Sequence, residues 1–145
     1  MIDNDALRII DANSNRTREA LRVIEDIVRF RSEDARLTSR LKRERHVIAR
    51  HCDHLLKHDR KGLRARQTST DPGRDSMTRG EAHRADWTDV MISNFRRAEE
   101  GLRVLEEVSK LIDVGLSRHF KRSRFRVYRL EKECMSGSGG GRESD

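Results

Sequence analysis

The sequence predicts an all-α protein, a four-helix bundle with pseudo-two-fold symmetry that is built from a duplicated helical hairpin. Three observations predict this class: apolar residues repeat with a helical period, there is a single proline, and a long motif occurs twice. Because proline removes a backbone donor and clashes with the preceding turn, its near absence permits long uninterrupted helices. Only 34% of the residues are hydrophobic and 39% are charged, which suits helices whose apolar stripe covers less than half of their surface.

The first hairpin is predicted over residues 5–56. Its first helix spans about 5–30, with Leu21, Ile24 and Val28 in the apolar stripe. The segment Ser32-Glu33-Asp34 interrupts this pattern, and its short polar side chains can cap free backbone N–H groups. A second helix over about 35–56 therefore follows.

Residues from about 58 to 85 are predicted to form a long loop, because they hold Pro72 and several glycines and show little periodicity. Loops of this length inside compact domains are usually functional or mobile. The second hairpin follows, with helices over about 86–112 and 116–134. Residues 1–134 thus form a single helical domain, and residues 135–145 have the Gly- and Ser-rich composition of a flexible tail or linker.

The formal charge of +7 implies an anionic partner: nucleic acid, membrane headgroups or phosphorylated small molecules. Arginine greatly outnumbers lysine, and its guanidinium group binds phosphate with two hydrogen bonds, which favours phosphate. The two cysteines, Cys52 and Cys134, form no C-x-x-C pair and indicate a reducing compartment. We expect a cytoplasmic protein without a membrane anchor, since neither a signal peptide nor an apolar run of about 20 residues is visible.

The internal repeat is a motif of the form Asn-x-x-Arg-x-x-Glu-x-x-Arg-x-x-Glu. A shift of 81 positions aligns residues 13–26 with residues 94–107, and seven of the 14 columns are identical. A shift of 79 aligns Lys42-Arg43-x-Arg45-His46 with Lys121-Arg122-x-Arg124-Phe125 more weakly. The whole hairpin is therefore predicted to be duplicated, and sites in such bundles lie between facing helices.

The repeated charges have two interpretations. Residues three apart on a helix are neighbours, so Arg and Glu in the motif can form ordinary ion pairs of about 0.2–0.5 kcal/mol each. Their presence at matching positions in both copies, however, indicates a common constraint. That constraint is either structural, such as interhelical ion pairs, or a functional site.

As a site, the repeated motif suits phosphate chemistry. Guanidinium groups neutralise phosphate oxygens, and carboxylates hold a hard cation that bridges those oxygens. His46, next to Arg45, is a candidate to face the same cavity, and the turn around Asp71 and Gly73 is a candidate to close over a phosphate. No P-loop motif is present.

Two segments, Arg8–Phe30 and Ser93–Glu107, together with Arg124-Phe125-x-x-Tyr128-x-Leu130-Glu131, resemble a small all-helical family of thiamine biosynthesis. Members of that family stand alone or are fused to the N-terminus of thiamine phosphate synthase. The resemblance implies hydroxymethylpyrimidine phosphate kinase activity, in which ATP converts the monophosphate to the diphosphate. Where that family carries Asp-Val-Gly in its loop, this chain reads Asp71-Pro72-Gly73, and the proline stiffens the segment.

From the resemblance and the repeat together we expect ATP and Mg²⁺ as cofactors and a phosphorylated pyrimidine as substrate. The expected catalytic residues are Arg22, Arg103, Glu25 and Glu106; the expected phosphate- and substrate-binding residues are Asn13, Arg16, Arg45, His46, Asn94, Arg97, Asp71 and Gly73; and the expected metal ligands are Glu19, Glu100 and Asp26. The two copies are expected to have diverged where they bind donor and acceptor, at Asn15/Arg96, Arg18/Glu99 and Phe30/Leu111.

Two other functions stay open at this point. A nucleic-acid-binding module is disfavoured, because carboxylates alternate with the arginines and would repel a phosphate backbone. A non-enzymatic partner of a thiamine enzyme is the other, with the repeated motif as its interface. A homodimer and an association with thiamine phosphate synthase are both compatible with the sequence.

Overall fold

The computed structural model describes residues 3–57, 69–75 and 83–137. Four long helices account for most of these residues: α1 (Asn4–Ile27), α2 (Ala35–Lys57), α5 (Trp87–Ser109) and α6 (Val114–Gly137). A short π-helical turn, η1 (Val28–Ser32), extends α1. The described ranges contain no strand, so the predicted all-α class is confirmed.

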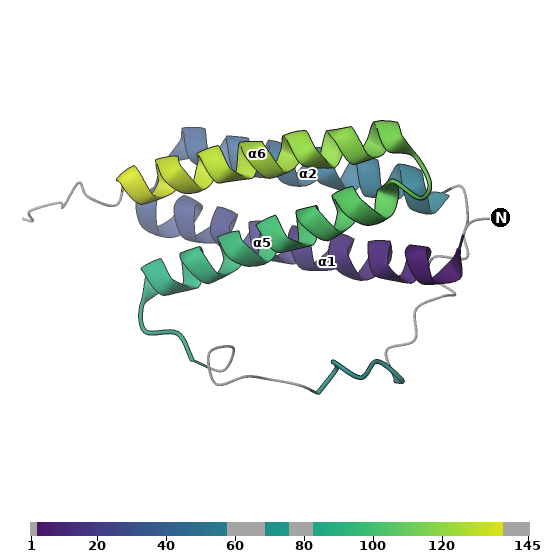
Figure 1. Ribbon diagram of the computed structural model, residues 1–145. Coiled ribbons are helices and arrows are strands. Elements are labelled where there is room, and N and C mark those ends of the chain that lie inside the picture. Colours follow the sequence, from purple (N-terminus) through teal and green to yellow (C-terminus); the bar gives the residue numbers. More distant parts are fainter. Residues whose placement is uncertain (1–2, 58–68, 76–82, 138–145) are drawn as a thin grey trace, which may run out of the picture.

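The helices form a bundle of two antiparallel hairpins, α1–α2 and α5–α6. Helix α1 packs against α2 and α5, and α6 packs against the same two helices, so that the α2–α6 pair lies across the bundle from the α1–α5 pair. Figure 1 shows that α1 and α5 run in opposite directions, as do α2 and α6. Because α2 and α5 run the same way, α2 ends at one end of the bundle and α5 begins at the other.

An aspartate caps the N-terminus of each of the four helices. Asp3, Asp34, Asp86 and Asp113 each accept a hydrogen bond from a backbone N–H of the following turn, at 3.0, 3.0, 2.7 and 3.2 Å. These bonds satisfy donors that have no partner inside the helix. The cap predicted within residues 32–34 is therefore confirmed, at Asp34.

The second hairpin differs from its predicted boundaries. Helix α5 ends at Ser109 and not near residue 112, because the N–H groups of Leu111 and Ile112 turn back to carbonyls three residues earlier, at 3.1 and 2.9 Å. The next helix begins at Val114, since Asp113 caps it, and continues to Gly137. Residues 135–137 of the predicted tail are thus helical, and residues 138–145 lie outside the described part of the chain.

The predicted loop is described at residues 69–75 and 83–86, where no helix or strand forms. Its remaining residues lie outside the described ranges. Figure 1 shows the segment 69–75 away from the helices, on the α1–α5 side of the bundle. None of the described helices is both long and apolar enough to cross a membrane.

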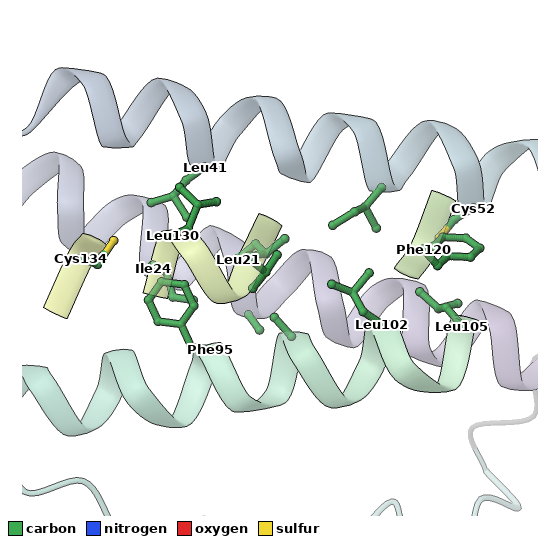
Figure 2. Close-up of a cluster of buried hydrophobic side chains, with 14 of the residues drawn as sticks. Leu21, Ile24, Leu41, Cys52, Phe95, Leu102, Leu105, Phe120, Leu130 and Cys134 are labelled. Atoms are coloured by element: carbon green, nitrogen blue, oxygen red, sulfur yellow. The ribbon is translucent and has the colours of Figure 1, made fainter. Parts of the chain in front are cut away.

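One apolar core fills the space between the four helices. Phe95 of α5 and Phe120 of α6 are its largest fully buried side chains. In Figure 2, Phe95 lies toward the same end of the bundle as Ile24 of α1, whereas Phe120 lies near Cys52 of α2 toward the other end. Both cysteines are buried in this core, and neither forms a disulfide.

Candidate functional site on the outer face of α1 and α5

Helices α1 and α5 are in close contact at Gly101. A Cβ atom at that position would overlap the hydroxyl oxygen of Thr17 and would lie 3.4 Å from the backbone oxygen of Asn13. The repeat pairs Thr17 with Ala98 and Ala20 with Gly101, so small residues from both copies stand at the crossing, where Ala20 and Ala98 are buried. The contact therefore lies at the pseudo-two-fold axis.

The two asparagines of the repeat have matching local contacts. The Nδ2 of Asn13 donates to the carbonyl of Ile9 at 2.9 Å, and the Nδ2 of Asn94 donates to the carbonyl of Val90 at 2.8 Å. Each amide is thereby held against its own helix one turn earlier. This fixes the direction of both side chains beside the α1–α5 contact.

Arg16 and Arg97 lie next to these asparagines and are exposed. Arg16 follows Asn13 by three positions, which turns it about 60° further from the side of α1 that carries Glu25. It therefore lies at the outer edge of the α1–α5 contact, and the pseudo-symmetry places Arg97 at the same edge. We call Asn13, Arg16, Asn94 and Arg97 the outer face.

The two arginines of the outer face are close along the bundle. Thr17 is level with Gly101 on the antiparallel α5, so Arg97 is level with residue 21 of α1. Measured along the bundle axis, Arg16 and Arg97 are therefore five residues apart, which at a rise of 1.5 Å per residue is about 8 Å. Neither arginine has a carboxylate partner in the described ranges, which leaves both guanidinium groups available to an anion.

The other half of the repeated motif forms ion pairs inside each hairpin. In the first hairpin, Glu25 is buried and its Oε2 accepts from the Nε of Arg45 on α2 at 3.1 Å. Arg22, with 55% of its side chain exposed, lies 3.9 Å from the same oxygen and 3.5 Å from Asp26. One buried carboxylate therefore holds two arginines from two helices.

The second hairpin repeats this arrangement. The Oε2 of buried Glu106 accepts from Arg124 of α6, whose Nε and Nη2 are both 3.1 Å away. Arg103 lies 3.5 Å from Glu106 and 3.3 Å from Glu107. Arg124 was not among the predicted site residues. The weak alignment at offset 79, which pairs it with Arg45, is the signal that identifies it.

The structure does not bring the two ion-pair clusters together. Glu25 is eight residues beyond Thr17, and Glu106 is five residues beyond Gly101 in the opposite direction. At 1.5 Å per residue their backbones are about 20 Å apart along the bundle. A donor and an acceptor held one at each cluster would not meet. The clusters have the geometry of the interhelical ion pairs that the sequence left open, and the catalytic role of their residues stays a prediction.

Several predicted residues lie away from both groups. His46 lines an open hollow of about 650 Å³ along the exposed side of α2. It was predicted to face the same cavity as Arg45 and does not, because neighbouring residues on a helix point about 100° apart. Asp71 and Gly73 form a small turn in the exposed segment 69–75, where the Gly73 N–H donates to Asp71 Oδ1 at 2.9 Å. Their binding role also stays a prediction.

The predicted metal ligands do not gather into one site. Glu19 and Glu100 are exposed, and Asp26 is paired with Arg22. In the ranges 3–57, 69–75 and 83–137, no three His, Cys, Asp or Glu side chains are grouped so that they could hold a metal ion. A resident, fully protein-bound cation therefore does not fit the described residues.

The aligned position Arg18/Glu99, which differs between the two copies, makes a different contact in each copy. The pKa of Glu99 is raised to about 8, chiefly by burial. A hydrogen bond with the neighbouring Glu131 carboxyl group and the charge of that group raise it further. In the first copy the equivalent positions are Arg18 and Cys52. There burial raises the pKa of the Cys52 thiol to about 11. Both pairs lie within a hairpin and not on the outer face.

Comparison with known proteins gives a consistent family match. The model of the ThiD2 family matches residues 8–133. Curated relatives are named thiamine-phosphate synthase: the protein of Thermosynechococcus vestitus is 43% identical over 86% of this chain, that of Nostoc punctiforme 41% over 88%, and that of Rhodopirellula baltica 35% over 88%. These regions are 34%, 35% and 33% of the relatives, so the chain spans about a third of their length. No solved structure gives a significant match.

Proposed function

The chain belongs to the ThiD2 family, which relates it to thiamine biosynthesis, and on this premise we propose that it transfers a phosphoryl group from ATP to 4-amino-5-hydroxymethyl-2-methylpyrimidine phosphate. The product is the diphosphate. The observation that carries the proposal is the outer face. There, two arginines without carboxylate partners in the described ranges are related by a pseudo-two-fold axis and differ by about 8 Å in level along the bundle.

Two arginines related by this pseudo-two-fold axis suit a reaction between two phosphates. One guanidinium group contacts the monophosphate of the acceptor, and the other contacts the terminal phosphates of the donor. An oxygen of the acceptor phosphate attacks the γ-phosphorus of ATP, and the bond from that phosphorus to the β–γ bridging oxygen breaks, which releases ADP. Because the attacking oxygen is already anionic, positioning and charge neutralisation supply the rate, and no strong base is required.

Mg²⁺ enters this proposal as part of the donor. Magnesium is usually held by one or two carboxylates together with substrate phosphates. It therefore arrives as MgATP, and Glu19 and Glu100, exposed on the same two helices, remain the nearest predicted carboxylates for it. The two ion-pair clusters hold each hairpin in register, so that the arginines of the outer face keep their separation.

The test is incubation of the protein with the pyrimidine monophosphate, ATP and Mg²⁺, followed by mass detection. We expect equal amounts of the diphosphate and ADP, and neither without the protein. ADP without diphosphate, or no turnover of either substrate, would overturn the proposal. An Arg22→Ala or Arg103→Ala variant that keeps full activity would show that the ion-pair clusters take no part in catalysis.

A second function has one observation in its favour. Ile9 and Val23 of α1 are 42% and 38% exposed and lie near the outer face. Exposed apolar side chains of this kind favour a non-enzymatic module that docks on a partner protein. Such a partner would resemble the part of the curated relatives that lies outside the region matched by this chain, which is about two thirds of their length. The same assay separates the two functions, because a docking module forms no diphosphate by itself.

A further inference from the structure

A second group of arginines lines a cleft on the opposite side of the bundle, between α2 and α6. The cleft has a volume of about 160 Å³, and its lining is Arg40, Arg43, Glu44, Arg126, Arg129 and Leu130. This volume has room for a small anion and a few waters, given that a water occupies about 30 Å³ in the liquid. The outer face lies on the other helix pair, so the cleft is separate from the proposed phosphoryl-transfer site.

The charges in the cleft are not balanced. Arg40 is paired with Glu133, and Arg126 donates from its Nε to Glu44 Oε2 at 2.8 Å. Arg43 and Arg129 are exposed, and neither has a carboxylate partner among the described residues. Four guanidinium groups thus face two carboxylates, and this excess of positive charge favours an anion in the cleft.

Glu44 brings a buried carboxylate to the lining of the cleft. Its side chain is buried, with 6% of the residue exposed, and only its Oε2 is bonded. The other oxygen, Oε1, is buried without a hydrogen-bond donor in the described part of the chain. A buried carboxylate oxygen without a donor is costly, so a ligand that brings a donor to it gains affinity.

We propose that this cleft binds inorganic phosphate in its hydrogen phosphate form. The arginines neutralise the unprotonated oxygens of the phosphate. Glu44 Oε1 has less than 1 Å² exposed, so the carboxylate group turns toward the cleft when phosphate binds, and the P–OH group then donates its hydrogen to this oxygen. Sulfate has the same size and charge as the phosphate dianion but carries no hydrogen at neutral pH. Glu44 would repel it, and the cleft therefore prefers phosphate to sulfate.

The repeat supplies a matched control. The positions equivalent to Arg43 and Arg129 are Arg122 and Arg50, and the position equivalent to Glu44 is Ser123. The pseudo-symmetric position therefore has the two arginines without the carboxylate, and neither Arg122 nor Arg50 lines the cleft. Replacing them removes the same charge from α2 and α6 and leaves the proposed site intact.

The test is equilibrium dialysis with radiolabelled inorganic phosphate. It uses an Arg16→Ala/Arg97→Ala background, so that phosphate bound at the outer face does not contribute and the result does not depend on kinase activity. We expect Arg43→Ala/Arg129→Ala to weaken phosphate binding by at least about tenfold, because it removes charge-assisted hydrogen bonds. Arg50→Ala/Arg122→Ala should change it by less than about twofold.

Sulfate competition tests the role of Glu44. With Glu44 in place, sulfate should displace phosphate poorly; Glu44→Gln, which turns an acceptor into a donor, should let sulfate compete as well as unlabelled phosphate. Circular dichroism checks that each variant is folded. Phosphate binding that survives Arg43→Ala/Arg129→Ala, or equal competition by sulfate before Glu44 is changed, would overturn the proposal.

Discussion

Gly101 shows how one residue sets the approach of two helices. Any side chain at this position would overlap the Thr17 hydroxyl group, so the α1–α5 contact requires glycine opposite threonine. The equivalent contact in the other copy uses Ala20 and Ala98, which shows that two alanines fit the same crossing.

A substitution at this crossing can therefore be rescued. Gly101→Ala should lower the free energy of unfolding by about 1–3 kcal/mol, since overpacking forces the backbones apart. Thr17→Ala in addition removes the hydroxyl oxygen and should restore most of that loss. Urea unfolding of both variants measures the effect, and a double variant no more stable than Gly101→Ala would contradict the overlap at Thr17.

Glu99 gives the stability a pH dependence. Burial and the neighbouring Glu131 raise its pKa in the folded protein to about 8, whereas the pKa of a glutamate in the unfolded chain is about 4.5. Between these values the folded state keeps a proton that the unfolded state has lost, so this group makes the protein less stable as the pH rises from 4.5 toward 8.

Glu99→Gln should remove that dependence, because the amide keeps a hydrogen-bonding group toward Glu131 without titrating. Thermal or urea unfolding between pH 5 and pH 9 checks it: the variant should gain stability relative to the parent as the pH rises. Glu19→Gln, at an exposed position of α1, is the control. If the free energy of unfolding changes with pH in the same way in the parent and in Glu99→Gln, Glu99 does not keep a proton in the folded state.

At the scale of the helices, local sequence signals were reliable where a cap was visible. Asp34 follows a clear break in the apolar pattern and caps α2 as predicted. Asp113 plays the same role for α6, but the apolar residues Leu111 and Ile112 continue the helical pattern past the end of α5. The helix end there depends on backbone bonds to Val108 and Ser109, which no periodicity reveals.

The cap at Asp113 should contribute measurably to stability. Asp113→Ala removes acceptors for the N–H groups of Gly115 and Leu116, at 2.8 and 3.2 Å. The expected loss in the free energy of unfolding is about 1 kcal/mol, the usual cost of removing a cap. Chemical unfolding measures it, and Asp113→Asn, which keeps an acceptor oxygen, should lose much less. Equal losses in the two variants would contradict the capping role.

The repeated motif shows what spacing along a helix can and cannot predict. A three-residue spacing turns each step back by about 60°, so Arg16 and Glu25 point to opposite sides of α1. The structure accordingly divides the motif into the outer face and the ion pair with Arg45. Spacing alone could not decide this division, because it depends on where α2 and α5 pack.

At the scale of the whole molecule, the duplication was predictable and the position of its axis was not. Two offsets, 81 for α1–α5 and 79 for α2–α6, indicated two hairpins. The sequence could not show that the copies are antiparallel, which moves Glu25 and Glu106 to separate ends and brings Arg16 and Arg97 toward the middle. Long-range packing decides these positions, and no local pattern encodes it.

The placement of phosphoryl transfer on the outer face is tested most directly by the rate of diphosphate formation in arginine variants. Arg16→Ala and Arg97→Ala should each lower kcat/KM by at least about tenfold, because each removes a charged phosphate contact. Arg36→Ala is the matched control, because Arg36 is an exposed arginine on α2, outside the α1–α5 pair that carries the outer face. It should keep most of the activity. If Arg36→Ala loses as much activity as Arg97→Ala, or if Arg16→Ala and Arg97→Ala both keep the parent rate, the outer face is not where the reaction occurs.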